Sequence, residues 1–249
     1  MSELGASLSF PFRNPLWLRR VLAGAVLELA PVPLVLPLAL AAVGRLHRLG
    51  WSAFALLPLA AAVGLVCRFL VLGYLRRTAK GVLDGTTEGL PAWDRPAEDL
   101  IEGLKLWVVA VVLWLPAVAV TGGVMLLVMA VASRSAAWVP LVMIGVPAAL
   151  ATLVYLPAGL LATVADGEPL AAFDFERVAG RVARAFGPYA LAFLVAIAAE
   201  IIAQLGLLIC CVGIFATRFA AHCVAVHAFA SAFRQGAVPL PAGPSEGAI

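Results

Sequence analysis

Four charged residues lie inside otherwise apolar stretches of this 249-residue chain: Glu28, Arg68, Glu200 and Arg218. A charge in membrane hydrocarbon costs about 2.5–3.5 kcal/mol or more, so such residues are usually paired or functional. Glu28 and Arg68 each lie seven residues from one end of an apolar stretch. In antiparallel helices this spacing puts both about 10 Å below the same membrane surface. Glu200 and Arg218 are equally distant from residue 209, so each predicted hairpin offers an acid and a base at one depth.

Two interpretations of these four charges stay open. The favoured one is structural: the ion pairs Glu28–Arg68 and Glu200–Arg218, or pairs exchanged between hairpins, fix the register of the helices, because an unpaired buried charge is far more costly. The functional one is a pathway for protons or solutes, lined by the same four groups and by three further polar side chains. These three are Gln204, His222 and His227.

No pattern in the sequence is typical of an enzyme, a metal site or a cofactor site. The chain has no G-x-S-x-G, no phosphate-binding loop and no H-E-x-x-H. His222 and His227 are five residues apart, which separates them by about 140° around a helix. The four cysteines form no C-x-x-C and lie in apolar stretches, as buried free thiols do. We therefore expect no enzymatic activity, no cofactor and no metal.

Transmembrane helices are the elements that must position these residues. The chain is 63% hydrophobic and 12% charged, with a mean hydropathy of +1.04, whereas an ordinary soluble domain is about half apolar and about a quarter charged. So few charges cannot cover a soluble surface, which excludes a typical cytosolic enzyme and a disordered chain. The net charge of +3 is too small for a nucleic-acid-binding protein. The expected partner is the lipid bilayer.

Six apolar stretches are long enough to cross about 30 Å of hydrocarbon as helices. They are residues 21–43, 51–75, 106–132, 136–165, 188–208 and 212–233. Short connections join them into three antiparallel hairpins, so the sequence predicts an all-α polytopic membrane protein with a single domain over residues 21–236. Residues 1–20 are predicted to form a cytoplasmic interfacial segment, and the Pro- and Gly-rich residues 237–249 to form a disordered tail.

The distribution of basic residues predicts the orientation. Twelve Arg and Lys residues lie in the N-terminal segment, in the two long connections and at the C-terminus, whereas only Arg45, Arg48 and Arg134 lie in the connections on the opposite side. Cytoplasmic loops carry the excess of Arg and Lys in membrane proteins. We therefore expect a multi-pass protein of the cell membrane with both termini in the cytoplasm.

An amphipathic segment precedes each predicted hairpin, at residues 4–20, 94–105 and 169–186. In the second segment Asp94 is the expected N-cap. Its expected apolar face carries Leu100, Ile101, Leu104 and Trp107. Basic amphipathic helices lie in the headgroup plane of a membrane. We therefore expect three arginines of the third segment to contact anionic lipid headgroups, at about 1 kcal/mol each. They are Arg177, Arg181 and Arg184.

The alternative to an interfacial role is a docking surface for a cytoplasmic protein partner. It would use an acidic cluster in the first long connection and the segment that follows it. The cluster consists of Glu88, Asp94, Glu98, Asp99 and Glu102. Amphipathicity alone names no partner, so the interfacial interpretation is favoured.

Several segments of the chain are similar to one family. They are FPFRNPLWLRR (10–20), GYLRR (73–77), LPAWD (90–94), DLIEGLK (99–105) and AAFDFERV (171–178). Their order and composition resemble an uncharacterised prokaryotic membrane family, domain of unknown function 4013. The resemblance implies a multi-pass integral membrane protein and carries over no catalytic residue.

Two functions are compatible with these observations. The first hypothesis is a non-enzymatic membrane scaffold or accessory component, which a dry core and an exposed apolar groove would favour. The second is a small-solute or lipid transporter or channel that uses the intramembrane Glu and Arg groups. A water-accessible cavity that reaches those groups would favour the second. The sequence decides neither a protein partner nor a homo-oligomeric state.

Overall fold

The computed structural model describes residues 3–32, 52–86, 89–131, 138–209 and 213–237, and the secondary structure in these ranges is helical throughout. The α-helices are α1 (Glu3–Ser9), α2 (Trp17–Leu29), α4 (Ser52–Asp84), α5 (Pro96–Val131), α6 (Trp138–Pro140), α7 (Val146–Asp166), α8 (Phe175–Arg184), α9 (Phe186–Gln204) and α10 (Gly213–Gln235). Shorter helical turns are η1 (Phe10–Phe12), η4 (Leu141–Gly145), η5 (Pro169–Phe173) and η6 (Leu205–Ile209).

Five helical segments in the described ranges are long and apolar enough to cross a membrane. They are Pro58–Asp84, Pro96–Ala130, Leu141–Asp166, Phe186–Leu208 and Gly213–Gln235. These segments overlap the last five of the six predicted spans, and the all-helical architecture is confirmed and compatible with a membrane protein. The first predicted span, 21–43, includes α2 up to Leu29. Its residues 33–43 lie outside the described part of the chain, as do residues 238–249 of the predicted tail.

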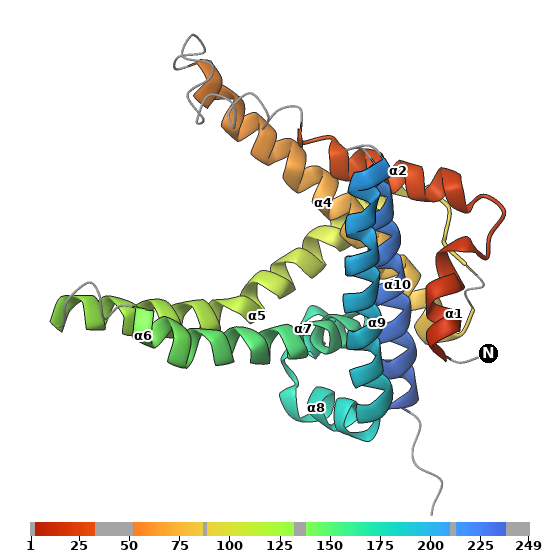
Figure 1. Ribbon diagram of the computed structural model, residues 1–249. Coiled ribbons are helices and arrows are strands. Elements are labelled where there is room, and N and C mark those ends of the chain that lie inside the picture. The colour runs from red at the N-terminus through yellow and green to blue at the C-terminus, as the bar shows by residue number, and fades with distance from the viewer. Residues whose placement is uncertain (1–2, 33–51, 87–88, 132–137, 210–212, 238–249) are drawn as a thin grey trace, which may run out of the picture.

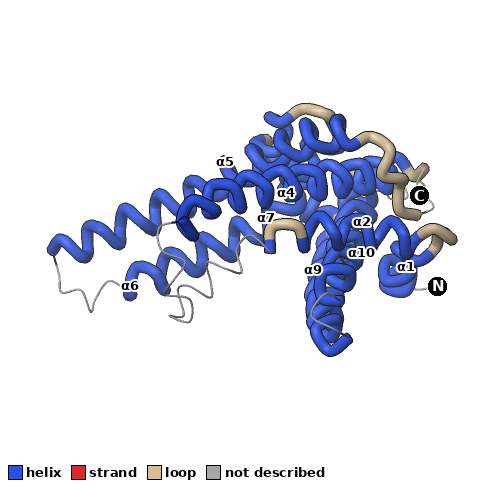
Figure 2. The backbone as a smooth tube through the Cα atoms, turned by 90° about the horizontal axis from the view of Figure 1, so that it is seen from above, coloured by secondary structure: helices blue, strands red, loops and turns tan. Residues whose placement is uncertain are grey.

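Helices α9 and α10 lie side by side, with α2 across one end of this pair and α8 near the other end (Figure 1). Helices α5 and α7 run alongside each other away from the pair, and α4 crosses α5 and then diverges from it. In the view from above, α1 lies on the opposite side of the α9–α10 pair from the far ends of α5 and α7 (Figure 2). Polar groups on the crossing faces of α2, α4 and α10 are therefore brought together.

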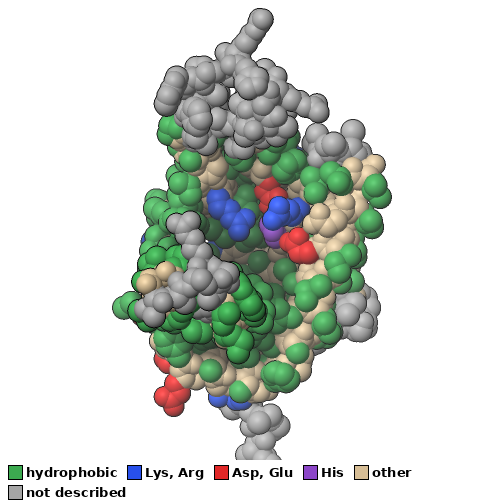
Figure 3. Space-filling view, turned by 60° about the vertical axis from the view of Figure 1, so that its left-hand side comes forward, with side chains coloured by type: hydrophobic (Ala, Val, Ile, Leu, Met, Phe, Trp, Pro, Cys, Tyr) green, Lys and Arg blue, Asp and Glu red, His purple; other side chains and the backbone are tan. Residues whose placement is uncertain are grey.

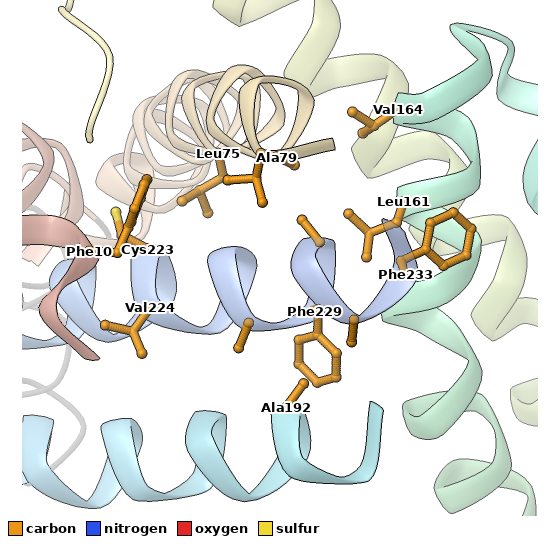
Figure 4. Close-up of a cluster of buried hydrophobic side chains, with 14 of the residues drawn as sticks. Phe10, Leu75, Ala79, Leu161, Val164, Ala192, Cys223, Val224, Phe229 and Phe233 are labelled. Atoms are coloured by element: carbon orange, nitrogen blue, oxygen red, sulfur yellow. The ribbon is translucent and has the colours of Figure 1, made fainter. Parts of the chain in front are cut away.

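Helix α10 is central to the core, because it packs against α1, α2, α4, α7 and α9. Large side chains from different helices meet there, including Phe10, Leu161 and the α10 residues Phe229 and Phe233 (Figure 4). Helices α9 and α10 also carry several buried alanines, and small side chains of this kind allow helices to approach closely in a membrane. They include Ala192, Ala199, Ala203, Ala221 and Ala228.

The amphipathic segment at 94–105 differs from its prediction. It is not a separate helix, because α5 continues without a break from Pro96 to Val131. Asp94 does not cap this helix. Its carboxylate accepts a hydrogen bond from Arg77 of α4 instead. The predicted apolar face is largely exposed at Ile101 and Leu104. A face carrying Asp99, Gly103 and Leu106 is buried, because α4 packs on that side of α5.

The third amphipathic segment forms η5 and α8. Asp174 caps α8 by accepting a hydrogen bond from the backbone nitrogen of Arg177. Val178 faces inward and is fully buried, whereas Phe175 and Phe186 are exposed. This segment is therefore an amphipathic helix that buries only part of its apolar face within the chain.

Candidate functional site

A charged hollow of about 200 Å³ opens among α2, α4 and α10. Its lining residues are Leu27, Glu28, Pro31, Gly64, Cys67, Arg68, Val71, Phe215, Arg218 and His222. Basic, acidic and histidine side chains gather in a depression framed by hydrophobic side chains (Figure 3). Three of the four predicted intramembrane charges thus share one cavity, and the fourth, Glu200, reaches His222 from α9.

His222 lies between two carboxylates. Its Nδ1 is 3.1 Å from Oε1 of Glu28 on α2, and its Nε2 is 3.4 Å from Oε1 of Glu200 on α9. A neutral imidazole carries one N–H and can serve only one of these carboxylates, whereas a protonated imidazolium carries two. The arrangement is therefore able to hold one proton between two acids.

These contacts replace the predicted ion pairs. Within the described residues, neither Glu28–Arg68 nor Glu200–Arg218 comes within 4.0 Å, and both carboxylates contact His222 instead. Helix α2 packs on α10, where Gly24 lies directly against the Phe219 ring, and Glu28 of the same helix contacts His222.

The pairing of Glu200 with Arg218 was predicted from a turn centred on residue 209, and residues 210–212 next to it lie outside the described part of the chain. The sequence pattern alone includes His222 only as one member of a wider pathway.

Arg68 and Arg218 line the hollow without a protein partner among the residues that the structure describes. Within the described part of the chain, no carboxylate lies within 4.0 Å of either guanidinium group, and neither donates a hydrogen bond. Both side chains are exposed to the space around them. The other two polar residues of the predicted pathway lie elsewhere: His227 contacts Ser7 and the Phe10 ring, and Gln204 is exposed on α9.

The described residues contain no group of three or more His, Cys, Asp or Glu side chains placed to hold a metal ion. The thiols of Cys67 and Cys223 are free and buried. The hollow and its surroundings thus bring together two guanidinium groups and an imidazole that lies between two carboxylates.

A second polar cluster, which we call the α4–α5 clasp, lies where α4 and α5 cross. Arg77 of α4 holds Asp99 of α5 through two nitrogens: its Nη2 donates to Oδ2 at 2.8 Å, and its Nε lies 2.8 Å from Oδ1. The same guanidinium donates to Asp94 Oδ1 at 2.7 Å and to the Ala92 carbonyl at 2.9 Å. Asp99 is only 1% exposed, so it does not belong to the exposed acidic docking cluster that the sequence suggested.

The loop between α4 and α5 folds back onto the clasp. The Tyr74 ring stacks on the Trp93 ring with centroids 4.0 Å apart, and the Tyr74 hydroxyl donates to the Pro91 carbonyl at 2.9 Å. Trp93 Nε1 in turn donates to the Arg20 carbonyl at 3.0 Å, while the Arg20 guanidinium donates to the Leu90 carbonyl. These bonds fix the start of α2 relative to α4, and with it the position of Glu28 further along α2.

Arg77 also changes the ionisation of Asp94, which lies in this loop. The hydrogen bond from the guanidinium stabilises the ionised carboxylate and holds the pKa of Asp94 below its usual range. Asp94 stays charged at neutral pH and contributes to the clasp in that form.

The three arginines of α8 each have a partner within the chain. Arg177 lies 2.6 Å from Asp166 and 3.1 Å from Asp174. The Arg181 guanidinium lies over the Phe233 ring, 4.9 Å from its centroid, and Arg184 Nε donates to the Gly236 carbonyl at 3.0 Å. These contacts dock α8 against the ends of α7 and α10. Arg177 and Arg184 keep exposed surface, so their remaining donors are available to headgroups.

Comparison with protein families shows which family the chain matches. A family model described as "Protein of unknown function (DUF4013)" matches residues 56–212, which is more than half of the chain. The chain belongs to the DUF4013 family. Comparisons with curated proteins and with solved structures give no match. The DUF4013 match contains four of the segments on which the resemblance rests, and the first segment, residues 10–20, precedes it.

The DUF4013 match includes all of one polar cluster but only part of the other. The α4–α5 clasp lies entirely within the match and is built from the segments 73–77, 90–94 and 99–105. The charged hollow lies partly within it, because Arg68 and Glu200 fall inside the match. The other three residues, Glu28, Arg218 and His222, fall outside. Segments within the match thus contact α2 and α4, two of the helices that frame the hollow.

Proposed function

We propose that this DUF4013 protein is a non-enzymatic small-solute transporter or channel, and that the charged hollow is where the solute binds. The observation that carries the proposal is the hollow itself. Arg68 and Arg218 line it from two apolar helices without a protein carboxylate beside them among the described residues. Charges in membrane hydrocarbon are costly, and a purely structural role would pair each of them. Unpaired guanidinium groups in a cavity are instead expected where the cavity takes up a polar ligand.

The membrane topology is part of this proposal. We propose six spans in three hairpins in the cell membrane, with both termini in the cytoplasm, on the basis of the excess of Arg and Lys on one side. Fusing a reporter that is active only in the cytoplasm to positions 47, 134 and 237 tests it. Activity at 237 together with inactivity at 47 and 134 is expected, and the reverse pattern at any of the three would contradict the topology.

The scaffold or accessory function is the second candidate, and one observation favours it. An apolar groove of about 550 Å³ lies between α7 and α8, lined by residues that include Leu150, Val154, Val182 and Phe186. A groove of this kind on an interfacial helix fits acyl chains or an apolar helix. We also propose that Arg177 and Arg184 place this groove at the headgroup level.

Accessibility of the hollow from the two aqueous phases distinguishes the candidates. In a background whose four cysteines are replaced by alanine, Phe215→Cys puts a thiol in the hollow, and Ile197→Cys puts one on the exposed face of α9. A charged, membrane-impermeant thiol reagent is applied to membrane vesicles of both orientations. Transport predicts that Phe215→Cys is labelled from both sides and that Ile197→Cys is not labelled. Labelling of Phe215→Cys from one side only, or from neither, would overturn transport and favour the accessory function.

A further inference from the structure

We propose that the solute of the charged hollow is a small oxyanion, a carboxylate or a phosphate, which Arg68 and Arg218 bind while His222 holds a proton between Glu28 and Glu200. This inference deepens the proposed transport function and rests on it. It names the chemical class of the solute and adds that a proton binds with it.

The two arginines supply the anion-binding groups. A guanidinium presents several N–H donors in one plane, a geometry that matches the two oxygens of a carboxylate or phosphate. Inside a membrane such a group usually pairs with an acid of the protein. Here both nearby acids contact His222, and Arg68 and Arg218 line the same cavity from α4 and α10. The N–H donors of the two guanidinium groups are therefore available to the oxygens of a bound anion.

The charge balance of the cluster couples the anion to a proton. With His222 neutral, the charges of the two glutamates and the two arginines cancel. A proton on His222 makes the cluster positive by one, and a bound monoanion returns it to neutrality. Because net charge is costly in a low-dielectric site, the proton favours the anion and the anion favours the proton to the same extent.

The groups around His222 are consistent with this coupling. Glu28 approaches it from α2 and Glu200 from α9, on opposite ring nitrogens. Arg68 and Cys67 line the hollow from α4, and Arg218 lies one helical turn before His222 on α10. In the proposed coupling, the two carboxylates flank the protonated ring of His222, and the bound anion lies with the two arginines.

The size of the hollow limits the anion. A volume of about 200 Å³ is below the range of about 300–1,000 Å³ typical of pockets for drug-sized ligands. An anion of a few heavy atoms fits in such a hollow. The same chemistry is available from a free anion or from the phosphate of a lipid headgroup, and the test separates these two sources.

Binding of acetate and of inorganic phosphate to the full-length protein in neutral detergent, measured by isothermal titration calorimetry, tests the anion site. Arg68→Gln and Arg218→Gln are each expected to weaken binding by about tenfold or more, as loss of a charge-assisted hydrogen bond does. The matched control is Arg19→Gln, an exposed arginine on α2 outside the hollow, and it is expected to bind as the wild type does. Arg68→Lys keeps the charge and is expected to bind acetate and phosphate more tightly than Arg68→Gln. This comparison distinguishes loss of the charge from misfolding of the variant.

The proton is tested with acetate, which stays a monoanion between about pH 6 and pH 8. The wild type is expected to bind it about tenfold more tightly at pH 6 than at pH 8, and His222→Gln is expected to bind it equally at both. Nanodiscs of phosphatidylglycerol and of phosphatidylcholine separate the two sources. Equal acetate affinity in both lipids indicates a free anion, and competition by phosphatidylglycerol that depends on Arg68 indicates a headgroup.

Wild-type affinity for acetate and phosphate in both Arg→Gln variants, or an equal loss in Arg19→Gln, would overturn the anion site. An unchanged pH dependence in His222→Gln would overturn the coupled proton. These failures are distinct from a failure of transport. If the hollow is labelled from both sides but binds no anion, the inference alone is wrong. If it binds the anion but is open to one side only, the transport function is wrong and the anion site stands.

Discussion

Gly73 of α4 lies directly against the backbone of Asp99 in α5, so closely that a β-carbon at position 73 would overlap the Asp99 carbonyl group. Gly103, one helical turn further along α5, meets the backbone of Phe69 in the same way. Two glycines therefore let the axes of α4 and α5 approach until Arg77 reaches the carboxylate of Asp99. The buried ion pair and the close crossing depend on each other.

The first prediction concerns this crossing. Gly73→Ala and Gly103→Ala are each expected to lower the free energy of unfolding by about 1–3 kcal/mol, because the added methyl group meets backbone that cannot rotate away. The control is Gly122→Ala in the same helix α5, where nothing lies within 4 Å of an added β-carbon. It is expected to be neutral or stabilising by up to about 1 kcal/mol, because alanine is the better helix former.

Thermal unfolding of the purified proteins in detergent measures both effects. Equal unfolding temperatures for Gly103→Ala and Gly122→Ala would contradict the close crossing of α4 and α5.

The second prediction concerns the buried pair itself. Asp99→Asn leaves the Arg77 guanidinium without its main counter-charge, and removal of one partner of a buried pair typically costs about 3–5 kcal/mol. The double variant Arg77→Leu/Asp99→Leu is expected to be less destabilised than Asp99→Asn, because it leaves no unpaired charge. Asp84→Asn breaks the exposed pair with Lys80 and serves as the control, with an expected change within about 0.5 kcal/mol.

Chemical unfolding monitored by tryptophan fluorescence ranks these variants. The single variants Arg77→Leu and Asp99→Leu are measured beside the double variant. If the double variant loses as much stability as the two single variants added together, Arg77 and Asp99 act independently.

Much of the architecture was predictable because membrane helices obey a simple rule of length and hydropathy. Apolar runs of about 20 residues have the length of a helix that crosses the hydrocarbon core of a membrane. The last five predicted spans accordingly overlap the five candidate spans. The boundary of α5 was not predictable in this way. Residues 94–105 have the periodicity of a separate surface helix, yet they continue directly into the span because Asp99 and Gly103 pack on α4.

The sequence allowed us to predict which side chains gather in one region, but not which of them contact each other. Charges in apolar stretches were identified as the place where partners must meet, and four of them do converge on one region. Which group contacts which depends on the rotation of each helix about its axis. Gly24 of α2 lies directly against the Phe219 ring of α10, and Glu28 on the same helix contacts His222. The Arg77–Asp99 pair joins residues 22 positions apart, and no periodicity in the sequence links them.

The third prediction concerns pH and Asp94. Because Arg77 lowers the pKa of Asp94 in the folded protein, the carboxylate contributes stability at pH values above its unfolded pKa of about 3.9. That contribution is lost as the pH falls through the lowered, folded-state pKa. The wild type is therefore expected to unfold at a higher temperature than Asp94→Asn at about pH 7, and the difference is expected to vanish at about pH 2.

Unfolding temperatures of the two proteins, measured from about pH 7 to about pH 2, test this expectation. The control is Glu98→Gln, because Glu98 pairs with the exposed Arg95 at 3.5 Å and an exposed pair of this kind contributes little. This variant is expected to follow the wild type throughout. A constant difference between wild type and Asp94→Asn at every pH would show that Asp94 acts through its shape and not through its charge.

The last prediction ranks the two carboxylates that contact His222. Glu28 lies closer, at 3.1 Å, and its side chain is 13% exposed, whereas Glu200 lies at 3.4 Å and is 43% exposed. Water and ions screen an exposed pair more effectively, so Glu28 is expected to couple more strongly to His222. Double-mutant cycles of Glu28→Gln with His222→Gln and of Glu200→Gln with His222→Gln measure the two couplings. We expect about 1–2 kcal/mol for the first and less than about 1 kcal/mol for the second.

The same cycles decide between the observed contacts and the pairs that depth alone suggests. Cycles of Glu28→Gln with Arg68→Gln and of Glu200→Gln with Arg218→Gln are the controls, because neither of these pairs lies within 4.0 Å among the described residues. Their coupling energies are expected to be smaller than that of Glu28 with His222. A larger coupling of Glu28 to Arg68 than to His222 would mean that the arginine is already neutralised by the protein, and the hollow would then lack the free guanidinium that anion binding requires.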